Sequence, residues 1–244
     1  MSNKEIFQEK NNRLNANNTD LSSILETINN LPTSEGITPS GELSITENGT
    51  YDVTNYASAN VNITSSGGKY APTYISFRGF KGTDLSEEIN GLDTSNIELM
   101  TSMFYQSQQI TSLNLSNWNT SKVTNMGTMF YQCVALEQIN FKNWNTSKVT
   151  NMGQMFYGCT RLTELDLSSF TGENLTITMG MFDNCSTLSK IDIRNMSFGK
   201  VDTYSNMFNR VPANCLIIVK DDTAKAFVLA RRSDLTNVKT VVEL

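Results

Sequence analysis

Cysteine is the residue type in this chain whose spacing most directly suggests chemistry. The four cysteines include no Cys-X-X-Cys pair: Cys133, Cys159, Cys185 and Cys215. The first three are 26 residues apart, so a regular repeat would stack their thiols about 5 Å apart, within reach of a disulfide or a soft metal ion. Ser107 and Val211 occupy the same repeat position, which suits a column of small core residues. We therefore predict reduced, buried thiols, no metal site and no cofactor.

Acid–base chemistry has few candidate residues. The chain contains no histidine, which excludes histidine general bases, histidine-containing triads and histidine-ligated metal sites. Glu164 and Asp166 form a carboxylate pair, but their spacing of two residues places both on the exposed face of a predicted strand. No apolar surroundings are evident that would raise the pKa of either carboxyl for acid catalysis. We therefore expect no enzymatic activity.

Tryptophans could instead form a platform for stacking sugars. Trp118 and Trp144 are 26 residues apart. Their column stays apolar in the other copies of the repeat, where it contains Leu92, Phe170 and Met196. A column that is apolar throughout indicates the core, and we assign both tryptophans to it.

A tyrosine column has a different composition. Tyr105, Tyr131 and Tyr157 are followed at the same interval by Asp183 and Asn209. A column that accepts these polar residues is expected to reach water. The tyrosines are therefore predicted to form a half-exposed row, which either packs on the flank of the repeat or contributes to a ligand surface.

An internal repeat must position all these columns. The dipeptide Met-Phe recurs five times at intervals of 26 residues, beginning at residues 103, 129, 155, 181 and 207. Two further columns are apolar and lie two residues apart: Leu113, Ile139, Leu165, Ile191 and Ile217, then Leu115, Phe141, Leu167, Ile193 and Val219. Apolar residues spaced by two, with polar residues between them, indicate a β-strand. Each coil therefore carries one short strand, and stacked coils form a parallel sheet.

A second pattern in each coil has helical spacing. Its members in one coil are Val123, Met126, Met129, Phe130 and Cys133. Apolar residues three and four apart predict a short helix or 3₁₀ segment. The predicted fold class is thus a leucine-rich-repeat-type α/β solenoid of five coils, each with one short parallel strand and one short helix, preceded by an N-terminal helix and a small β module.

The strand face of this solenoid is the predicted ligand surface, because solenoids commonly bind along their stacked strands. The candidate residues between the buried strand positions are Asn114, Gln138, Asn140, Lys142, Glu164, Asp166, Lys190, Asp192 and Arg194. Amides and carboxylates can form hydrogen bonds with sugar hydroxyls, and Lys142 and Arg194 can contact phosphates of an anionic wall polymer. The alternative is a solvated polar face without a ligand. The tyrosine row is the second candidate surface.

Four segments are predicted along the chain: an N-terminal helix (1–32), a linker and small β module (33–68), the solenoid with its N-terminal cap (69–219), and a C-terminal cap (220–244). Residues 42–63 alternate around Asn48-Gly49 and predict a β-hairpin or small β unit. In the C-terminal segment, Asp221 or Asp222 can cap a helix that extends to about Arg232, followed by a strand over residues 239–244.

The N-terminal helix carries a partial heptad. Its apolar positions include Leu14, Leu21, Ile24, Ile28 and Leu31. A short parallel coiled coil with sister chains would bury them, and we predict a homotrimer. The alternatives are packing on the chain's own solenoid or docking to a different protein.

Composition limits the partners. The net charge is −5, so the basic surface that nucleic-acid binding requires is not indicated. No apolar stretch is long enough for a transmembrane helix, and the first residues lack the apolar core of a secretory signal. We therefore expect neither membrane insertion nor nucleic-acid binding.

The coil sequence NWNTSKVTNMGxMFYxC, with LxL or IxF before it, resembles the BspA-like leucine-rich repeats of bacterial surface proteins. The resemblance covers residues 84–219 and implies a solenoid for adhesion or binding, without catalytic residues. The segment ITENGTYDVTNYASANVNI resembles a short β module of tail-fibre and baseplate proteins from phages of Gram-positive bacteria.

These resemblances lead to two functional expectations. The first is a phage tail or baseplate protein, located in the virion, whose N-terminal region binds other tail proteins and whose solenoid binds a host surface glycan or protein. The absence of a signal peptide, lipobox cysteine or sorting motif favours this location. The alternative is a bacterial cell-surface adhesin.

Overall fold

The structure of the chain is a computed structural model. It describes residues 42–45, 50–52, 62–65, 74–80, 82, 83, 85, 89 and 92–244. All of these belong to one compact unit, residues 34–244. The predicted N-terminal helix and its heptad residues, including Leu14 and Ile28, lie outside the described residues.

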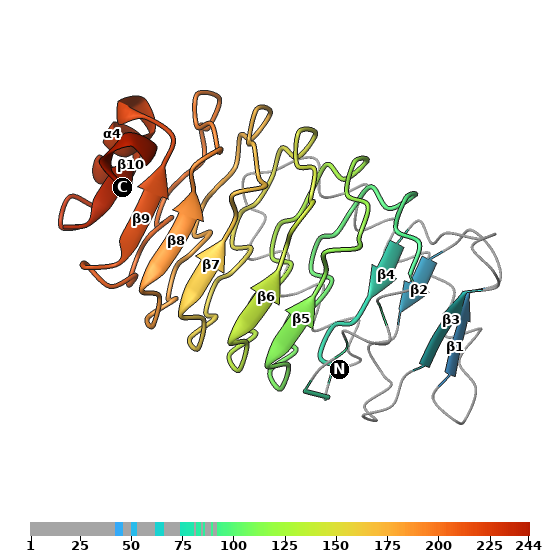
Figure 1. Ribbon diagram of the computed structural model, residues 1–244. Coiled ribbons are helices and arrows are strands. Elements are labelled where there is room, and N and C mark those ends of the chain that lie inside the picture. Colours follow the sequence, from blue (N-terminus) through green and yellow to red (C-terminus); the bar gives the residue numbers. More distant parts are fainter. Residues whose placement is uncertain are drawn as a thin grey trace. The chain divides into compact units, whose positions relative to one another are not determined.

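A parallel β-solenoid forms the body of this unit (Figure 1). Its strands recur every 26 residues: β5 (Ser112–Asn114), β6 (Gln138–Asn140), β7 (Glu164–Asp166), β8 (Lys190–Ile193) and β9 (Leu216–Val219). The predicted register is confirmed where Leu113 pairs with Ile139 and where Leu165 pairs with Ile191. A second ladder of parallel bridges joins Leu99 to Thr203 in four steps. The repeat thus makes about four full coils between these residues, rather than the predicted five.

The predicted short helix in each coil is wrong. Residues Met126 to Cys133 form successive tight turns, with Thr128 and Gln132 at positive φ values of 54° and 56°. Main-chain N–H groups at alternate positions donate to the next coil, as from Phe130 to Met155 O at 2.8 Å. The groups between them bond within the turn. An α-helix would keep every N–H within its own coil, so bonding between coils replaces helical bonding here.

The core confirms the burial predicted from the repeat. All five Met-Phe pairs are buried, and their rings stack from coil to coil with centroids 5.3–6.0 Å apart. Phe77 extends this stack toward the N-terminus at 5.2 Å from Phe104. Identical side chains in successive coils bury apolar surface that a single coil could not cover.

A distinct segment covers the C-terminal end, as predicted. Asp221 accepts a hydrogen bond from the N–H of Ala224 and caps helix α4 (Asp222–Leu229). Strand β10 (Val238–Thr240) then pairs in parallel with β9. The strand predicted over residues 239–244 is shorter because η1 (Val241–Glu243) follows, stabilised by the Glu243 carboxylate, which accepts from the N–H of Thr240.

The earlier strands pair in parallel. Strand β1 (Glu42–Ile45) pairs with β3 (Asn62–Ser65), and β2 (Thr50–Asp52) pairs with β4 (Tyr74–Ser76). The predicted β-hairpin is therefore wrong, since a hairpin requires antiparallel neighbours. The two strands of each pair are separated along the sequence by about one coil, which is the separation expected where the chain winds into successive coils of a solenoid. Among the described residues, no helix is long and apolar enough to cross a membrane.

Candidate functional site

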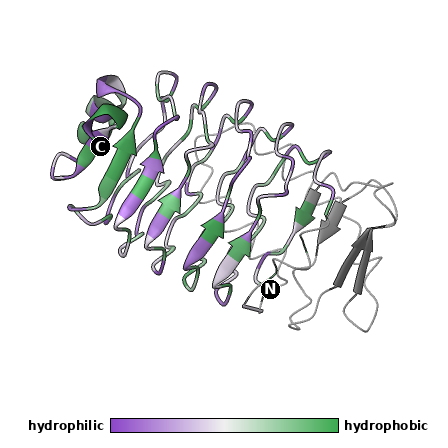
Figure 2. Cartoon of the chain, viewed as in Figure 1, coloured by the Kyte–Doolittle hydropathy of each residue, from purple (hydrophilic) through white to green (hydrophobic). Residues whose placement is uncertain are grey.

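The outward positions of the strands form two polar columns. One column contains Ser112, Gln138, Glu164 and Lys190, and the other contains Asn114, Asn140, Asp166 and Asp192. Both columns become apolar at β9, with Leu216 and Ile218, and Figure 2 shows this strand as hydrophobic. The polar strand face therefore extends from β5 to β8 only.

The second column closes the turns that follow the strands. The side-chain oxygens of Asn140 and Asp166 accept hydrogen bonds from the N–H groups of Lys142 and Ser168 at 3.0 and 2.9 Å. The same contact recurs after β5 and β8. An Asx turn of this kind satisfies main-chain donors where a strand ends. The column thus has a structural role that the sequence analysis did not assign to it.

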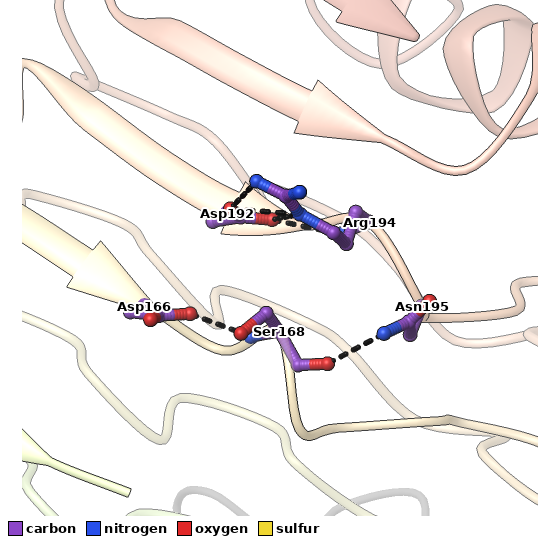
Figure 3. A network of polar contacts seen from close by, with 5 residues as sticks. All are labelled: Asp166, Ser168, Asp192, Arg194 and Asn195. Atoms are coloured by element: carbon purple, nitrogen blue, oxygen red, sulfur yellow. Dashed lines mark hydrogen bonds and ion pairs between the residues drawn. The ribbon is translucent and has the colours of Figure 1, made fainter. Parts of the chain in front are cut away.

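The positions of Asp192 and Arg194 differ from those predicted, in which both side chains face a ligand. Asp192 is only 4% exposed. The Nε of Arg194 donates to its two carboxylate oxygens at 2.9 and 3.0 Å (Figure 3). The hydrogen bonds from Arg194 to Asp192 also raise the pKa of the guanidinium. The charge of the Arg194 guanidinium is thus balanced by this carboxylate, while its side chain stays 39% exposed.

The same network connects neighbouring coils. Asn195, which follows β8, donates from Nδ2 to the main-chain oxygen of Ser168 at 2.7 Å. Ser168 in turn donates its N–H to Asp166 (Figure 3). Burial alone would raise the pKa of Asp166, but hydrogen bonds from Ser168 and the charges of Arg194 and Lys190 hold it below its ordinary value. Asp166 is thus held ionised at the edge of the strand face.

The ladder of strands is interrupted between β6 and β7. These strands belong to different sheets, β5–β6 and β7–β10. In the neighbouring coils, Glu137 N donates to Thr111 O and Ser189 N donates to Thr163 O, each at 2.8 Å. Among the described residues, the equivalent bond from Thr163 N to Glu137 O is absent. Ile139 and Leu165, which the repeat places in the strands of neighbouring coils, are therefore not joined in one hydrogen-bonded ladder.

Phe141 gives the physical reason for the interruption. It is the aromatic member of a column otherwise filled by Leu115, Leu167, Ile193 and Val219. Its ring packs edge-on against Trp144 at 4.7 Å and against Phe170 of the next coil at 5.4 Å. A ring occupies more space between coils than an aliphatic side chain, and close-packed cores transmit such changes to their surroundings. The two strands beside the ring, β6 and β7, therefore do not pair with each other in one sheet.

A groove of about 330 Å³ opens at the interruption. It is lined by Gln138 and Ile139 of β6, by the three residues of β7, and by Glu137, Thr163 and Lys190. Ile139 is half-buried, although its column partners Leu113 and Ile191 are buried. Ile139 supplies the accessible apolar floor beneath a polar rim, and Leu165, only 1% exposed, lies next to it.

The charges at the groove are close to balance. Glu137 pairs with Arg161 at 3.1 Å, and Glu164 lies opposite Lys190 in the β7–β8 register. Asp166 faces the positive charges of Lys190 and Arg194. The rim therefore offers hydrogen-bonding groups of both kinds, without a large excess of either charge.

The tyrosine row offers less surface than predicted. Tyr105 is 6% exposed, and only Tyr131 and Tyr157 are half-buried. The rings stack on one another at 4.8 and 4.7 Å, and the guanidinium of Arg78 covers Tyr105 at 4.4 Å. Both faces of Tyr131 are therefore occupied, so this ring cannot stack on a sugar. Burial and the charges of its neighbours raise its pKa to about 12.

Of the two polar residues in the tyrosine column, Asn209 is half-buried and Asp183 is buried. Asp183 accepts a hydrogen bond from Asn209 Nδ2 at 2.9 Å. Two polar residues in successive coils satisfy one another here. The column thus reaches water at Tyr131, Tyr157 and Asn209, as predicted, but not at Tyr105 or Asp183.

The cysteine and tryptophan columns lie in the core, as predicted. Trp144 donates its indole N–H to Leu115 O at 2.8 Å. All four cysteines are buried, and burial raises the pKa of Cys133 to about 12. Among the described residues, no cluster of three metal-ligating side chains occurs.

The sequence analysis predicted four of the groove residues, Gln138, Glu164, Asp166 and Lys190, and missed the other four: Glu137, Ile139, Thr163 and Leu165. Ile139 and Leu165 were assigned to the core, and Glu137 and Thr163 lie just outside the strands. The signal that marks the groove is Phe141, the one ring in an aliphatic column. That substitution was visible, but its effect on the sheet depends on packing between coils.

Comparison with known proteins identifies one matching family. A profile described as "Mycoplasma protein of unknown function, DUF285" matches residues 75–195 and, in an overlapping match, residues 111–217. Together the matches span residues 75–217, more than half of the chain, including the strands that border the groove. A search of curated proteins found no match.

Proposed function

The chain belongs to the DUF285 family of Mycoplasma proteins of unknown function, and we propose that it is a non-enzymatic binding protein of a phage tail or tail-like particle. In this proposal the solenoid projects from the particle and binds the host cell surface through its strand face. The N-terminal region attaches the chain to other tail proteins. The observation that carries the proposal is the polar strand face from β5 to β8, which contains the groove between β6 and β7 and is supported by a continuous core.

Several features of this face suit binding rather than catalysis. Of its carboxylates, Asp166 caps a turn and Glu137 pairs with Arg161. A general acid needs a carboxyl whose pKa is raised by apolar surroundings, whereas the pKa of Asp166 is lowered. A rigid array of hydrogen-bonding groups is the arrangement that repeat proteins use to recognise an extended ligand.

The identity of the coil type is a further part of the proposal. The strand sequence LxL or IxF and the 26-residue period support a variant of the BspA-like leucine-rich repeat in which turns replace the helix. The resemblance of residues 45–63 to phage tail modules supports the location in the virion. The family description names bacterial proteins, which supports a cell-surface adhesin as the second candidate function.

Two measurements test the proposal. The first is the location of the chain, determined by immunogold labelling of purified particles and of bacterial surfaces. Labelled tails support the proposal, and labelling restricted to the cell surface supports the adhesin. The second is co-sedimentation of the full-length chain with cell walls from a panel of Gram-positive bacteria, where binding to none of the walls contradicts a host-binding role.

A matched pair of variants assigns the binding face. The first variant changes Gln138, Glu164 and Lys190 to Ala, because these groove residues do not cap turns. The control variant changes the exposed Lys148 and Glu173 to Ala, which removes the same pair of opposite charges outside the groove. We expect wall binding to fall only in the first variant. Equal binding by both variants would exclude the strand face as the binding surface.

A further inference from the structure

We propose that the groove between β6 and β7 binds one neutral sugar unit of a surface glycan. The apolar floor lies against the C–H groups of the sugar ring, and the rim forms hydrogen bonds with its hydroxyl groups. This inference rests on the proposed function for the source of the glycan, and on the geometry of the groove for the chemistry of the ligand.

The size of the groove limits the ligand to a small unit. Its volume of about 330 Å³ is near the lower end of the range for small-molecule sites, which starts at about 300 Å³. The floor is fixed because Leu165 belongs to the core and Ile139 packs against it. A longer glycan could therefore place one unit in the groove while its neighbours lie along the polar column.

The interruption also supplies main-chain groups. Within the described part of the chain, neither the N–H of Thr163 nor the carbonyl oxygen of Glu137 has a main-chain partner. In a closed ladder these two groups would bond to each other, as the equivalent groups do between Thr111 and Glu137. A hydroxyl group both donates and accepts, so it can satisfy a donor and an acceptor that face each other across a gap.

The side chains on the rim complement hydroxyl groups as well. Glu164 and Asp166 are exposed acceptors, while Lys190 and Gln138 supply donors. Adjacent hydroxyls of a sugar ring can donate to one carboxylate, and hydrogen bonds to ionised groups are stronger than neutral ones. The rim therefore matches a polyol ring.

Charge distinguishes this ligand from the phosphates of an anionic wall polymer. Glu164 and Asp166 would repel a phosphate, and Arg194 is already bound to Asp192. Lys190 is the cation that borders the groove, and it lies opposite Glu164. With no uncompensated positive charge at the rim, a neutral sugar is favoured over an anion.

Methyl NMR on the full-length chain tests the inference, because Ile139 places methyl groups in the floor and the buried Leu165 lies next to it. The probes are N-acetylglucosamine, methyl α-glucoside and glycerol 1-phosphate. We expect at least one neutral sugar to shift both sets of methyl signals in a saturable manner, with a Kd of about 1 mM, and glycerol phosphate to leave them unchanged. The substitution Glu164→Gln should weaken the sugar about tenfold, whereas Glu173→Gln, outside the groove, should have no effect.

Two outcomes would overturn the inference: shifts caused by glycerol phosphate but by neither sugar, or no shift with any of the three probes. Cell-wall sedimentation of the same samples separates this result from the proposed function. If walls bind equally to wild type and Glu164→Gln and no methyl signals shift, the groove is excluded as the sugar site, while the proposed host-binding role still stands. Methyl shifts without wall binding would support the groove and contradict that role.

Discussion

The thiol of Cys159 donates a hydrogen bond to the main-chain oxygen of Phe130, 3.2 Å away in the preceding coil. Cys133 and Cys185 repeat this contact, and Ser107 makes it with its hydroxyl at 2.8 Å to Phe77 O. The column is thus a ladder of small donors that satisfy buried carbonyls, and Ser107 shows that a hydroxyl group serves equally well.

The first prediction compares two substitutions at this position. Cys159→Ala removes the side-chain donor to the carbonyl of Phe130, which still accepts from the N–H of Cys133, and is expected to lower the free energy of unfolding by about 1.5 kcal/mol. Cys159→Ser keeps a donor and should cost about 1 kcal/mol or less. Urea unfolding of both variants measures the difference. A Ser variant less stable than the Ala variant would contradict the role of the donor.

The second prediction concerns alkaline pH. Burial raises the pKa of Cys133 to about 12 and that of Cys215 to about 11. Above about pH 9 an unfolded chain loses thiol protons that the folded chain keeps, so stability must fall as pH rises, by up to about 1.4 kcal/mol per pH unit for each thiol. We expect unfolding free energies to decline from pH 9 to pH 11. In Cys133→Ser this decline should be shallower, and an identical pH dependence would exclude the thiol as its cause.

The periodic columns made the core predictable from sequence, but not the path of the backbone. The spacing of Met126, Met129 and Phe130 fits a helix and equally fits a ribbon of turns that faces the core at the same interval. What decides between them is whether each N–H bonds within its own coil or with the next one. That choice depends on contacts between coils, such as Phe130 N to Met155 O, which no single coil encodes.

The third prediction tests the stacked core. Phe156 is fully buried and stacks between Phe130 and Phe182 at 5.6 and 6.0 Å. Phe156→Ala removes contacts on both sides and is expected to cost about 3–5 kcal/mol. Thermal or urea unfolding measures this loss, and an unchanged midpoint would contradict the burial of the ring. Val134→Ala is a suitable control because Val134 is exposed.

The candidate site was predictable only where side chains alternate. The alternation placed Gln138, Glu164 and Lys190 on the strand face. The alternation could not show that Asp192 is buried. The burial of Asp192 depends on its hydrogen bonds with Arg194 and on the apolar end of the sheet at Ile218. Nor could the alternation show that Asn140 caps a turn, since a solvent-facing strand residue and an Asx-turn residue share the same sequence signal.

The fourth prediction tests the interrupted ladder by hydrogen exchange. The N–H of Thr163 lacks a main-chain partner, whereas the N–H of Glu137 is bonded to Thr111 O at 2.8 Å. The amide of Thr163 should exchange at least about tenfold faster than that of Glu137. Phe141→Leu restores an aliphatic column and should slow the exchange of Thr163. Equal protection of the two amides in the wild-type chain would contradict the interruption.

The last prediction concerns assembly through residues that lie outside the described part of the chain. Leu14, Leu21 and Ile28 recur every seven residues, and a heptad of this kind buries its apolar positions in a parallel coiled coil. We expect light scattering to give the mass of a trimer for the full-length chain. Replacing Leu21 and Ile28 with Asn should give monomers, because each sister chain then contributes unpaired polar groups to the seam. Replacing Asn18 and Asn30 with Gln should leave the mass unchanged. A monomeric wild-type chain would refute self-association, and residues 1–32 would then be assigned to docking on a different partner.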